Sequence, residues 1–366
     1  MLVKNNKTFY PFYLLLLFGI VSCTGNDGNR NPGLLPPASG QAGEIIVSMD
    51  SVQWYGQIGD TIRSIFGPEI HGLPREEPLF TLRYVDARKI TGLLKEVSNV
   101  MFVTTFDRKT RGARIVQNYF TPETKKEIKA NSNYFLVTSQ DVYAKGQEVM
   151  YLFGQDEQSL ISNLDEHRQR LVDHLNRLER ERLNNKIFKK NEKSVSKAIK
   201  ERFGCEIMLP EGFRMAQMEK DFVWMRYMDA VIDKNIFIAF TDYKDESQFS
   251  TDSIVAFRDA ICRKYLYEDK EEIPDSYLKT QTEVPFIPVL SKQINFNKKF
   301  ATETRGLWKT NNNSMGGPFL GITVVDESLN RLYYIEGFLY SPGKPQREIM
   351  REIETILHTF RTNEQL

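Results

Sequence analysis

Apolar residues recur with the period of strands in some segments of this chain and with the period of helices in others. In the first half, short apolar runs predict strands at 44–48, 79–84, 100–106, 112–119 and 148–153. Asp50 and Gln53 form a capping pair ahead of Trp54, Ile58, Ile62 and Ile65, which predicts a helix, and a second helix is expected at 87–97. Strands interleaved with helices at this spacing favour a sheet with helices packed on it.

A long helical segment is expected at 157–202, with a break near Asn184 and Asn185. Its first part carries a single stripe of leucines, so it should lie on a core: Leu160, Leu164, Leu171, Leu175 and Leu178. The stretch 177–202 holds ten bases against four acids. Such a strip either contacts lipid head groups, phosphates or an acidic partner, or is a solvated face with ion pairs along the helix, which is the commoner case.

The second half has the pattern of strands with two helices. Strands or extended segments are expected at 205–209, 222–228, 236–240, 284–290, 300–308, 319–325 and 331–340, and helices at 251–267 and from Pro345 onward. We therefore predict an α+β fold with mixed or antiparallel sheets and packed helices. Its two α/β sandwich-like halves, 44–203 and 204–366, are joined by the long helix. The order of elements in the second half is similar to that of small sandwiches of the PsbP and Mog type, a likeness of fold that carries no function.

The start of the chain has the layout of a bacterial lipoprotein signal peptide over 1–22. Lys4 and Lys7 precede an apolar run at 12–21, and Ser22 stands before Cys23. The run is half of the roughly 20 residues that span a bilayer, so it is too short for a permanent anchor. We expect cleavage before Cys23 and acylation of that residue, which attaches the protein to a membrane. The alternative is an uncleaved or ordinary secretory signal in which Cys23 is incidental.

Residues 23–43 are expected to form a flexible tether, because glycine and proline dominate and almost nothing there could pack. Thr24, rather than aspartate, follows the cysteine, and only one acid stands among the next residues. These positions favour an outer-membrane anchor that faces the periplasm, with exposure at the cell surface as the alternative.

Charge and composition exclude several classes of function. Loss of Lys4 and Lys7 with the signal leaves 49 − 2 = 47 bases against 48 acids, a formal charge of −1. A near-neutral body has no global field to attract nucleic acid, so no nucleic-acid partner is expected. Cys205 and Cys262 would remain after processing, either as buried free thiols, the interpretation we favour, or as a disulfide.

No catalytic, cofactor-binding or metal-binding residues are expected. The sequence holds four histidines, of which His167 and His174 lie two turns apart on the long helix and cannot share one metal ion directly. Phosphate-binding loops, nucleophile elbows and paired cysteine motifs do not occur in the sequence. A pair of carboxylates meeting in a cleft cannot be read from sequence, so a hydrolase of that kind stays open.

Two local clusters stand out by composition, at 71–80 and at 305–319. In the second, Arg305 and Trp308 precede the adjacent glycines Gly316 and Gly317. An arginine beside a tryptophan, with a close backbone approach at the glycines, forms a candidate binding edge. A hairpin packed by Trp308 explains the same residues without a ligand, and it is the commoner arrangement.

Together with Trp54 and the segments 141–147, 222–224 and 337–342, these clusters resemble the family described as domain of unknown function 4837. The resemblance runs through nearly the whole body and implies an envelope lipoprotein of Bacteroidota with a fold spanning 44–361. It implies no catalytic or ligand residues. The leading hypothesis is a lipid-anchored cell-envelope protein that binds or scaffolds an envelope protein or glycan without catalysis. The alternative is a periplasmic hydrolase acting on cell-wall or glycan material with a carboxylate pair.

Overall fold

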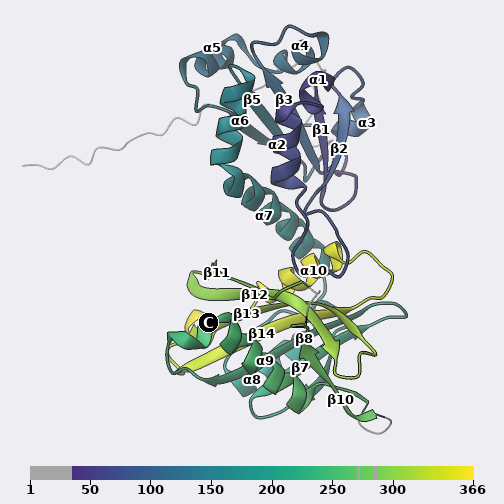
Figure 1. The fold of residues 1–366 in the computed structure, drawn as a ribbon, viewed down its shortest axis with the longest axis vertical. Helices are drawn as coiled ribbons and strands as arrows, with labels where there is room; N and C mark the ends of the chain where they lie inside the picture. Colours follow the sequence, from purple (N-terminus) through teal and green to yellow (C-terminus); the bar gives the residue numbers. More distant parts are fainter. Residues whose placement is uncertain (1–34, 270–272, 284–286) are drawn as a thin grey trace, which may run out of the picture.

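The computed structural model describes residues 35–269, 273–283 and 287–366. Within these ranges the chain forms two halves, each built on its own sheet, with the long helix α7 descending from the first toward the second (Figure 1). The fold is α+β, as the pattern of the sequence predicts. The expected signal peptide, Cys23 and the first part of the expected tether lie outside the described residues.

The first half contains a five-stranded mixed sheet in the order β2-β1-β3-β5-β4. Its strands are β1 (Glu44–Met49), β2 (Thr81–Asp86), β3 (Asn99–Thr105), β4 (Leu136–Gln140) and β5 (Glu148–Gly154). All pairings are parallel except that of β4 with β5. Every residue of β3 and β5 is buried, as expected for central strands covered on both faces.

Helices cover both faces of this sheet. One core contains side chains from α1 (Ser51–Trp54), α2 (Gln57–Phe66), α6 (Glu157–Glu166) and α7 (Arg168–Ile187). The core on the other face contains side chains from α3 (Gly92–Lys95), α4 (Arg111–Gln117) and α5 (Pro122–Ala130). The leucine stripe of α6 and α7 faces the first core, as its spacing predicts.

The second half contains a nine-stranded sheet whose strands pair antiparallel. The main path runs β6-β7-β8-β14-β13-β12-β10-β9, and β11 pairs with β12 outside that path. The bounds are β6 (Arg214–Met218), β7 (Phe222–Met228), β8 (Asp233–Asp242), β9 (Tyr267–Asp269), β10 (Ile273–Thr280), β11 (Leu290–Phe296), β12 (Lys299–Thr310), β13 (Gly316–Asp326) and β14 (Arg331–Tyr340).

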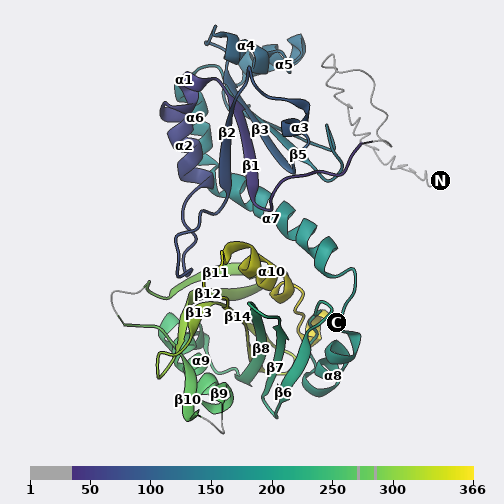
Figure 2. The ribbon, with the colours of Figure 1, turned by 90° about the vertical axis from the view of Figure 1, so that its right-hand side faces the viewer.

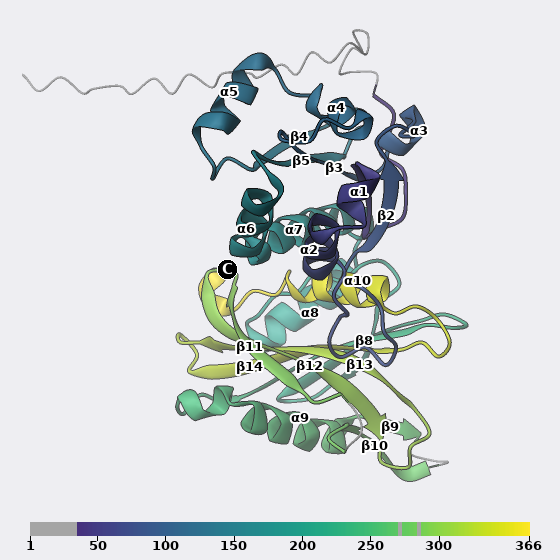
Figure 3. The same ribbon diagram turned by 45° about the horizontal axis from the view of Figure 1, so that its top comes forward.

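Helices α8 (Lys193–Phe203) and α10 (Arg347–Leu357) pack on one face of this sheet, and α9 (Thr251–Tyr265) packs on the other. Short 3-10 helices occupy Glu246–Phe249 and Asn363–Gln365. Helix α10 lies between the sheet and α7 (Figures 2 and 3). It therefore belongs to the core of the second half and also borders the first.

Three predicted elements differ from the structure, and several observed elements have no predicted counterpart. The strand expected at 112–119 is helix α4, because Thr110 caps it and Gly112 packs directly against Asp50. The helix expected at 87–97 shrinks to the single turn α3. The segment 205–209 is not a strand and makes one isolated bridge, from Glu206 to Arg361. Helix α5 and strands β4, β6, β9 and β10 have no counterpart among the predicted elements. Of the extended segment expected at 284–290, residues 284–286 lie outside the described residues, and strand β11 begins only at Leu290.

The breaks in the long helical segment also differ. The long helical segment breaks at His167 and again after Ile187, where Phe188 ends α7, rather than at Asn184. Helix α8, which the sequence groups with the first half, places Ile199 and Phe203 in the core of the second. The expected tether already contacts the body at Pro37 and Ser39, which form bridges to Lys145 and Val97.

Candidate functional site

A cleft of about 1690 Å³ lies between the two halves. Its walls come from α7 on one side and from β11, β12 and α10 on the other, with the loop that follows α2 closing one end. The lining residues include seven acids, seven bases and seven asparagines or glutamines. The cleft is therefore strongly polar and balanced in charge. Which ligands it could bind depends on the hydrogen bonds and ion pairs that these charged side chains make.

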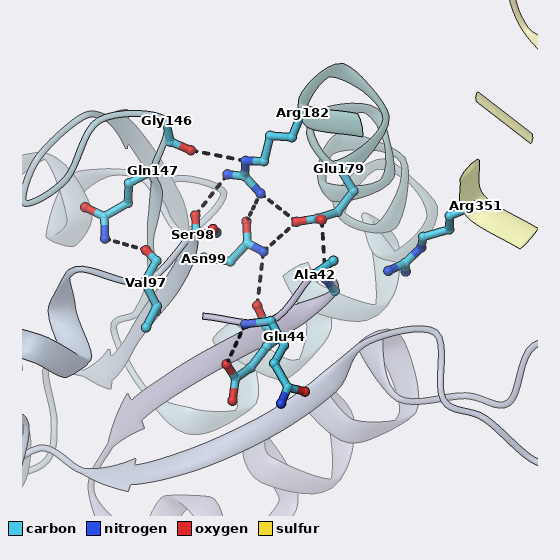
Figure 4. A network of polar contacts seen from close by, with 12 residues as sticks. Ala42, Glu44, Val97, Ser98, Asn99, Gly146, Gln147, Glu179, Arg182 and Arg351 are labelled. Carbon is cyan, nitrogen blue, oxygen red and sulfur yellow. Dashed lines mark hydrogen bonds and ion pairs between the residues drawn. The ribbon is translucent and has the colours of Figure 1, made fainter. Parts of the chain in front are cut away.

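Helix α7 is fixed to the first half by a buried polar network (Figure 4). The Glu179 carboxylate accepts hydrogen bonds from the Asn99 side chain at 2.9 Å, from Arg182 at 2.6 Å and from the backbone N–H of Gly43 at 3.3 Å. Arg182 donates further to two backbone oxygens, those of Ser98 and Gly146. Because Glu179 is only 3% exposed, its charge needs these donors, and their loss would leave a buried anion unpaired.

The residue next to this network reaches the other half. The Arg180 guanidinium donates to Nε2 of His358, the C-cap residue of α10, at 3.0 Å, and a second nitrogen lies 3.7 Å from the Glu354 carboxylate of α10. Adjacent residues of one helix thus bind different halves of the molecule. Helix α7 is the element that places a cation from the first half over a carboxylate of the second.

A second arginine lies beneath Arg180. Arg305 of β12 donates to Glu303 at 2.8 Å and to Glu354 at 2.9 Å, so one guanidinium joins two carboxylates. Lys292 of β11 approaches the same Glu303 oxygen at 3.0 Å. We call Arg180, Lys292, Glu303, Arg305, Glu354 and His358 the cleft cluster; all six line the hollow.

The electrostatics of the cleft cluster keep its acids ionised. Burial opposes ionisation of Glu354, but the positive charges of Arg305 and Arg180 outweigh it and lower its pKa to about 2. Burial acts in the same way on Glu303, whose pKa is nevertheless lowered, chiefly by Arg305. Burial, reinforced by the charge of Arg180, lowers the pKa of His358 to about 4. Near neutral pH the imidazole is therefore uncharged and accepts the Arg180 hydrogen bond.

The two halves are also joined at the far end of α10, where the helix has no side-chain cap of its own. The Glu77 carboxylate, from the loop after α2, accepts hydrogen bonds from the backbone N–H groups of Gln346 at 2.6 Å and Arg347 at 3.0 Å. An anion at a helix N-terminus satisfies free donors and complements the helix dipole. Arg347 and Arg351 of α10 in turn donate hydrogen bonds to the backbone oxygens of Pro78 and Leu79 in this loop.

A different arginine cluster lies on the opposite face of the second sheet. Arg258 of α9 binds the Glu336 carboxylate through two nitrogens, at 2.7 and 2.8 Å, and both side chains are fully buried. Tyr334 donates to Glu336 at 2.5 Å, and Thr280 accepts from Arg258 at 3.0 Å. Burial raises the pKa of Glu336, yet every polar group of this closed cluster has a partner inside the core.

The structure separates the residues of the candidate binding edge. Arg305 faces α10 and the cleft, whereas Trp308 lies on the other face of β12, where its indole N–H donates to the Leu339 oxygen at 3.2 Å. Gly317 pairs with Trp308 and permits this approach, since a Cβ there would lie 2.0 Å from the Leu339 oxygen, and Gly316 pairs with Lys309. Trp308 is 3% exposed and borders a cavity of about 50 Å³, so it packs rather than presents an edge.

The other residues considered in the sequence have ordinary structural roles. Cys205 and Cys262 are free and buried, and burial raises the pKa of each thiol to about 12. His174 bonds to Glu148 at 2.7 Å, and the His167 ring packs at a tilt against Phe135. Among the described residues no group of three histidine, cysteine or acidic side chains could hold a metal ion. Likewise, no helix within the described ranges combines the length and apolarity needed to cross a membrane.

Sequence reasoning singled out Arg305 but missed the other members of the cleft cluster. Two weak signals point to it: Glu303 and Arg305 are two apart on one face of a strand, and Glu354 and His358 are four apart on one face of a helix. Nothing in the sequence brings Arg180 to them, because that contact depends on how the halves meet.

Comparison with known families divides the chain at the same place as the fold. Residues 192–359 match the family described as Domain of unknown function (DUF4837). The first half, residues 38–188, matches another, described as Domain of unknown function (DUF8532). The resemblance expected through the whole body is thus supported for the DUF4837 half, while Trp54 and 141–147 fall in the DUF8532 half. No curated protein matches the chain in sequence.

Similarity to solved structures is slight. A mutant of the protein Mog1 aligns with a TM-score of 0.28 and 9% identity, covering 43% of this chain and 90% of its own. The Ran-binding protein MOG1p of Saccharomyces cerevisiae gives the same TM-score and identity over 44% of this chain and 92% of its own. The lipid transfer and protein localization domain of human StarD13 gives 0.20 and 12%, over 46% and 95%.

Proposed function

We propose that this chain is a lipid-anchored protein of the cell envelope that binds another envelope component in the cleft between its halves, without chemical conversion. The apolar run at 12–21 followed by Ser22 and Cys23 supports acylation and export. The compartment follows from the same segment: an outer-membrane anchor, with the body facing the periplasm. The match of the second half to the DUF4837 family accords with the resemblance on which the envelope assignment rests.

The observation that carries the binding role is the state of the acids in the cleft cluster. A hydrolase that works through two carboxylates needs one of them protonated near neutral pH, which requires a raised pKa. In the cleft, cations lower the pKa of both Glu303 and Glu354. His358, with a pKa of about 4, is also poorly matched to proton transfer at neutral pH. Fixed charges in a wide hollow favour recognition over the rival hypothesis of a periplasmic hydrolase.

The anchor is tested by metabolic labelling with a fatty-acid analogue in the native host. The wild-type chain should carry the label and sediment with membranes, whereas Cys23→Ala should carry none. Cys205→Ala is the matched control, since that thiol is buried and should leave labelling unchanged. Labelled Cys23→Ala protein, or an unlabelled wild type, would overturn the anchor.

The cleft is tested by placing a photo-crosslinking amino acid at Asn176, on the wall formed by α7, and at Lys220 in the exposed turn between β6 and β7. Irradiation of intact cells should give a discrete adduct from position 176 and none from position 220. Equal adducts from both positions, or none from 176, would contradict binding in the cleft. Release of fragments from cell-wall material by the purified chain, lost in Glu303→Gln, would instead support the hydrolase.

A further inference from the structure

Strand β11 leaves one edge of the second sheet open at the cleft. It pairs with β12 alone, in an unbroken register of seven residue pairs from Leu290–Arg305 to Phe296–Lys299. Among the described residues, no backbone group of β11 bonds to any other element. A row of free N–H and C=O groups along a regular strand is a template for another strand.

The other edges of the same sheet are blunted. Strand β9 has three residues, and its register with β10 shifts between Ile273 and Tyr277. Strand β6 has five residues, and its register with β7 is broken between Met215 and Gln217. Short strands and bulges are the usual protection against strand pairing. Strand β11 has seven residues, no such irregularity, and Lys292 as its one charged side chain.

The open edge borders the cleft rather than bulk solvent. Four consecutive residues, 292–295, line the hollow, which means that side chains from both faces of the strand contribute and the edge itself opens into it. Helix α7 forms the opposite wall, and both views of the ribbon place β11 below it (Figures 1 and 2). The arrangement is a groove with a strand edge on one side and a helix on the other.

The size and charge of the groove indicate which class of ligand fits it. Seven residues of strand extend about 23 Å, and the hollow of about 1690 Å³ exceeds the several hundred Å³ of a small-molecule site. Equal numbers of acids and bases line it, so it offers no net charge for a polyanion such as a phosphorylated lipid head group. Amide side chains and paired charges complement a polypeptide of mixed charge.

We propose that the cleft binds an extended peptide segment of a partner protein, which adds to β11 as an antiparallel or parallel strand between that edge and α7. The inference rests on the proposed binding role of the cleft and names the class of its ligand. Main-chain hydrogen bonds to β11 supply affinity that tolerates varied sequences, as in other cases of strand addition. The side chains of α7 and the cleft cluster then select among peptides by charge.

The probe is a library of randomised 12-residue peptides displayed on phage and selected against the processed chain purified in detergent. Selected peptides are synthesised with a methyl group on one backbone nitrogen at a time. In strand addition, alternate amides face β11, so methylation at every second position should weaken binding about tenfold, the effect of one lost hydrogen bond. The intervening positions should change Kd less than about threefold.

Two proline variants test the protein side. Successive backbone N–H groups of a strand point to opposite edges, so one of Lys292→Pro and Gln293→Pro removes a donor from the open edge while leaving the ladder to β12 intact. If that variant is Gln293→Pro, it should keep its thermal unfolding midpoint; if it is Lys292→Pro, its midpoint should match that of Lys292→Ala, which loses the same ion pair to Glu303. In either case it should lose about tenfold in peptide affinity. Lys292→Ala measures the effect of losing the lysine side chain alone, with the backbone donor kept. Arg214→Pro, on the edge strand β6, is the matched control that should bind the peptide normally.

Three outcomes would overturn the inference: no enriched peptide, selected peptides without alternation in the methyl scan, or peptides equally sensitive to Arg214→Pro and the β11 variants. These failures differ from failure of the proposed function. A glycan adduct at Asn176 in cells would sustain binding in the cleft and remove the peptide, whereas the absence of any adduct there would remove the binding role itself.

Discussion

The two faces of the second sheet each carry an arginine that binds carboxylates, and the two clusters have opposite character. Arg258 and Glu336 are fully buried between α9 and the sheet, and their partners come from that one core. Arg305 of β12 and Glu354 of α10 line one wall of the cleft, where Arg180 from the other half contacts Glu354. The same pair of residue types thus closes a core on one face and forms an ion pair with side chains 21% exposed on the other. Burial and the origin of the partners, rather than residue type, distinguish the closed ion pair from the one that borders the cleft.

The largest effect is expected at the closed cluster. Arg258→Leu leaves Glu336 charged and without its partner in the core, which should reduce the free energy of unfolding by about 3–5 kcal/mol. Urea denaturation followed by circular dichroism measures the loss. The double variant Arg258→Leu, Glu336→Leu should recover much of it, because both buried charges are then gone. A single variant as stable as the wild type would show that the cluster is hydrated.

The cleft cluster should make the free energy of unfolding depend on pH. Folding lowers the pKa of His358 to about 4, from its ordinary value of 6.5. Between pH 6.5 and pH 4, therefore, the imidazole is protonated in the unfolded chain but not in the folded chain. Stability is therefore complete above pH 6.5 and falls as the pH drops toward 4, by roughly 2–3 kcal/mol. Glu354 has the same sign in a lower window, from 4.5 toward 2.

Urea midpoints measured from about pH 7 to about pH 4.5 give the slope for wild type and for His358→Gln. The variant lacks the titrating group and should show a smaller slope in this window. An unchanged slope would place the titration at another residue.

A smaller loss is expected from Arg305→Leu. Glu303 and Glu354 keep Lys292 and Arg180 as partners and face the cleft, so the free energy of unfolding should fall by about 1–2 kcal/mol, less than for Arg258→Leu. The two variants are matched in chemistry and sheet, and the same urea titration compares them. Equal losses would erase the distinction between the clusters.

The smallest effect concerns the cap that joins the halves. Glu77→Ala removes the acceptor at the N-terminus of α10 and should cost about 1 kcal/mol. Hydrogen exchange should accelerate at the first amides of α10, and Glu76→Ala, an exposed neighbour, is the control. Unchanged exchange in Glu77→Ala would mean that the loop does not cap the helix in solution.

The regular parts of the fold were predictable because they follow from periodicity. The leucine stripe of α7 and the isoleucines of α10 lie where their spacing places them. In the second sheet, the predicted strands coincide with β7, β8, β12, β13 and β14. The wrong predictions occur where contacts with distant parts of the chain override the local sequence pattern. The segment at 112–119 has the apolar content of a strand, but the cap at Thr110 and the contact of Gly112 with Asp50 make it a helix.

The candidate binding edge shows a signal that was present in the sequence. Arg305 and Trp308 are three apart in a predicted strand, and that odd spacing alone puts them on opposite faces. The cleft cluster is different in kind, since Arg180 and Glu354 are 354 − 180 = 174 positions apart and meet only because the halves dock. Sequence patterns predict which residues share a face within one helix or strand, and at most which residues share a face of one sheet.

The cap on α10 also has a consequence for the order in which the molecule matures during synthesis. Glu77 emerges from the ribosome long before Gln346 and Arg347, which lie 269 and 270 positions later. Domains tend to fold as units while the chain lengthens, so the first sheet can form early, with the loop that carries Glu77 waiting for its helix. Docking of the halves, and with it formation of the cleft, is then the closing event of folding. A nascent chain stopped before residue 346 would hold the strands of both sheets but lack α10, and with it one wall of the cleft and part of the second core.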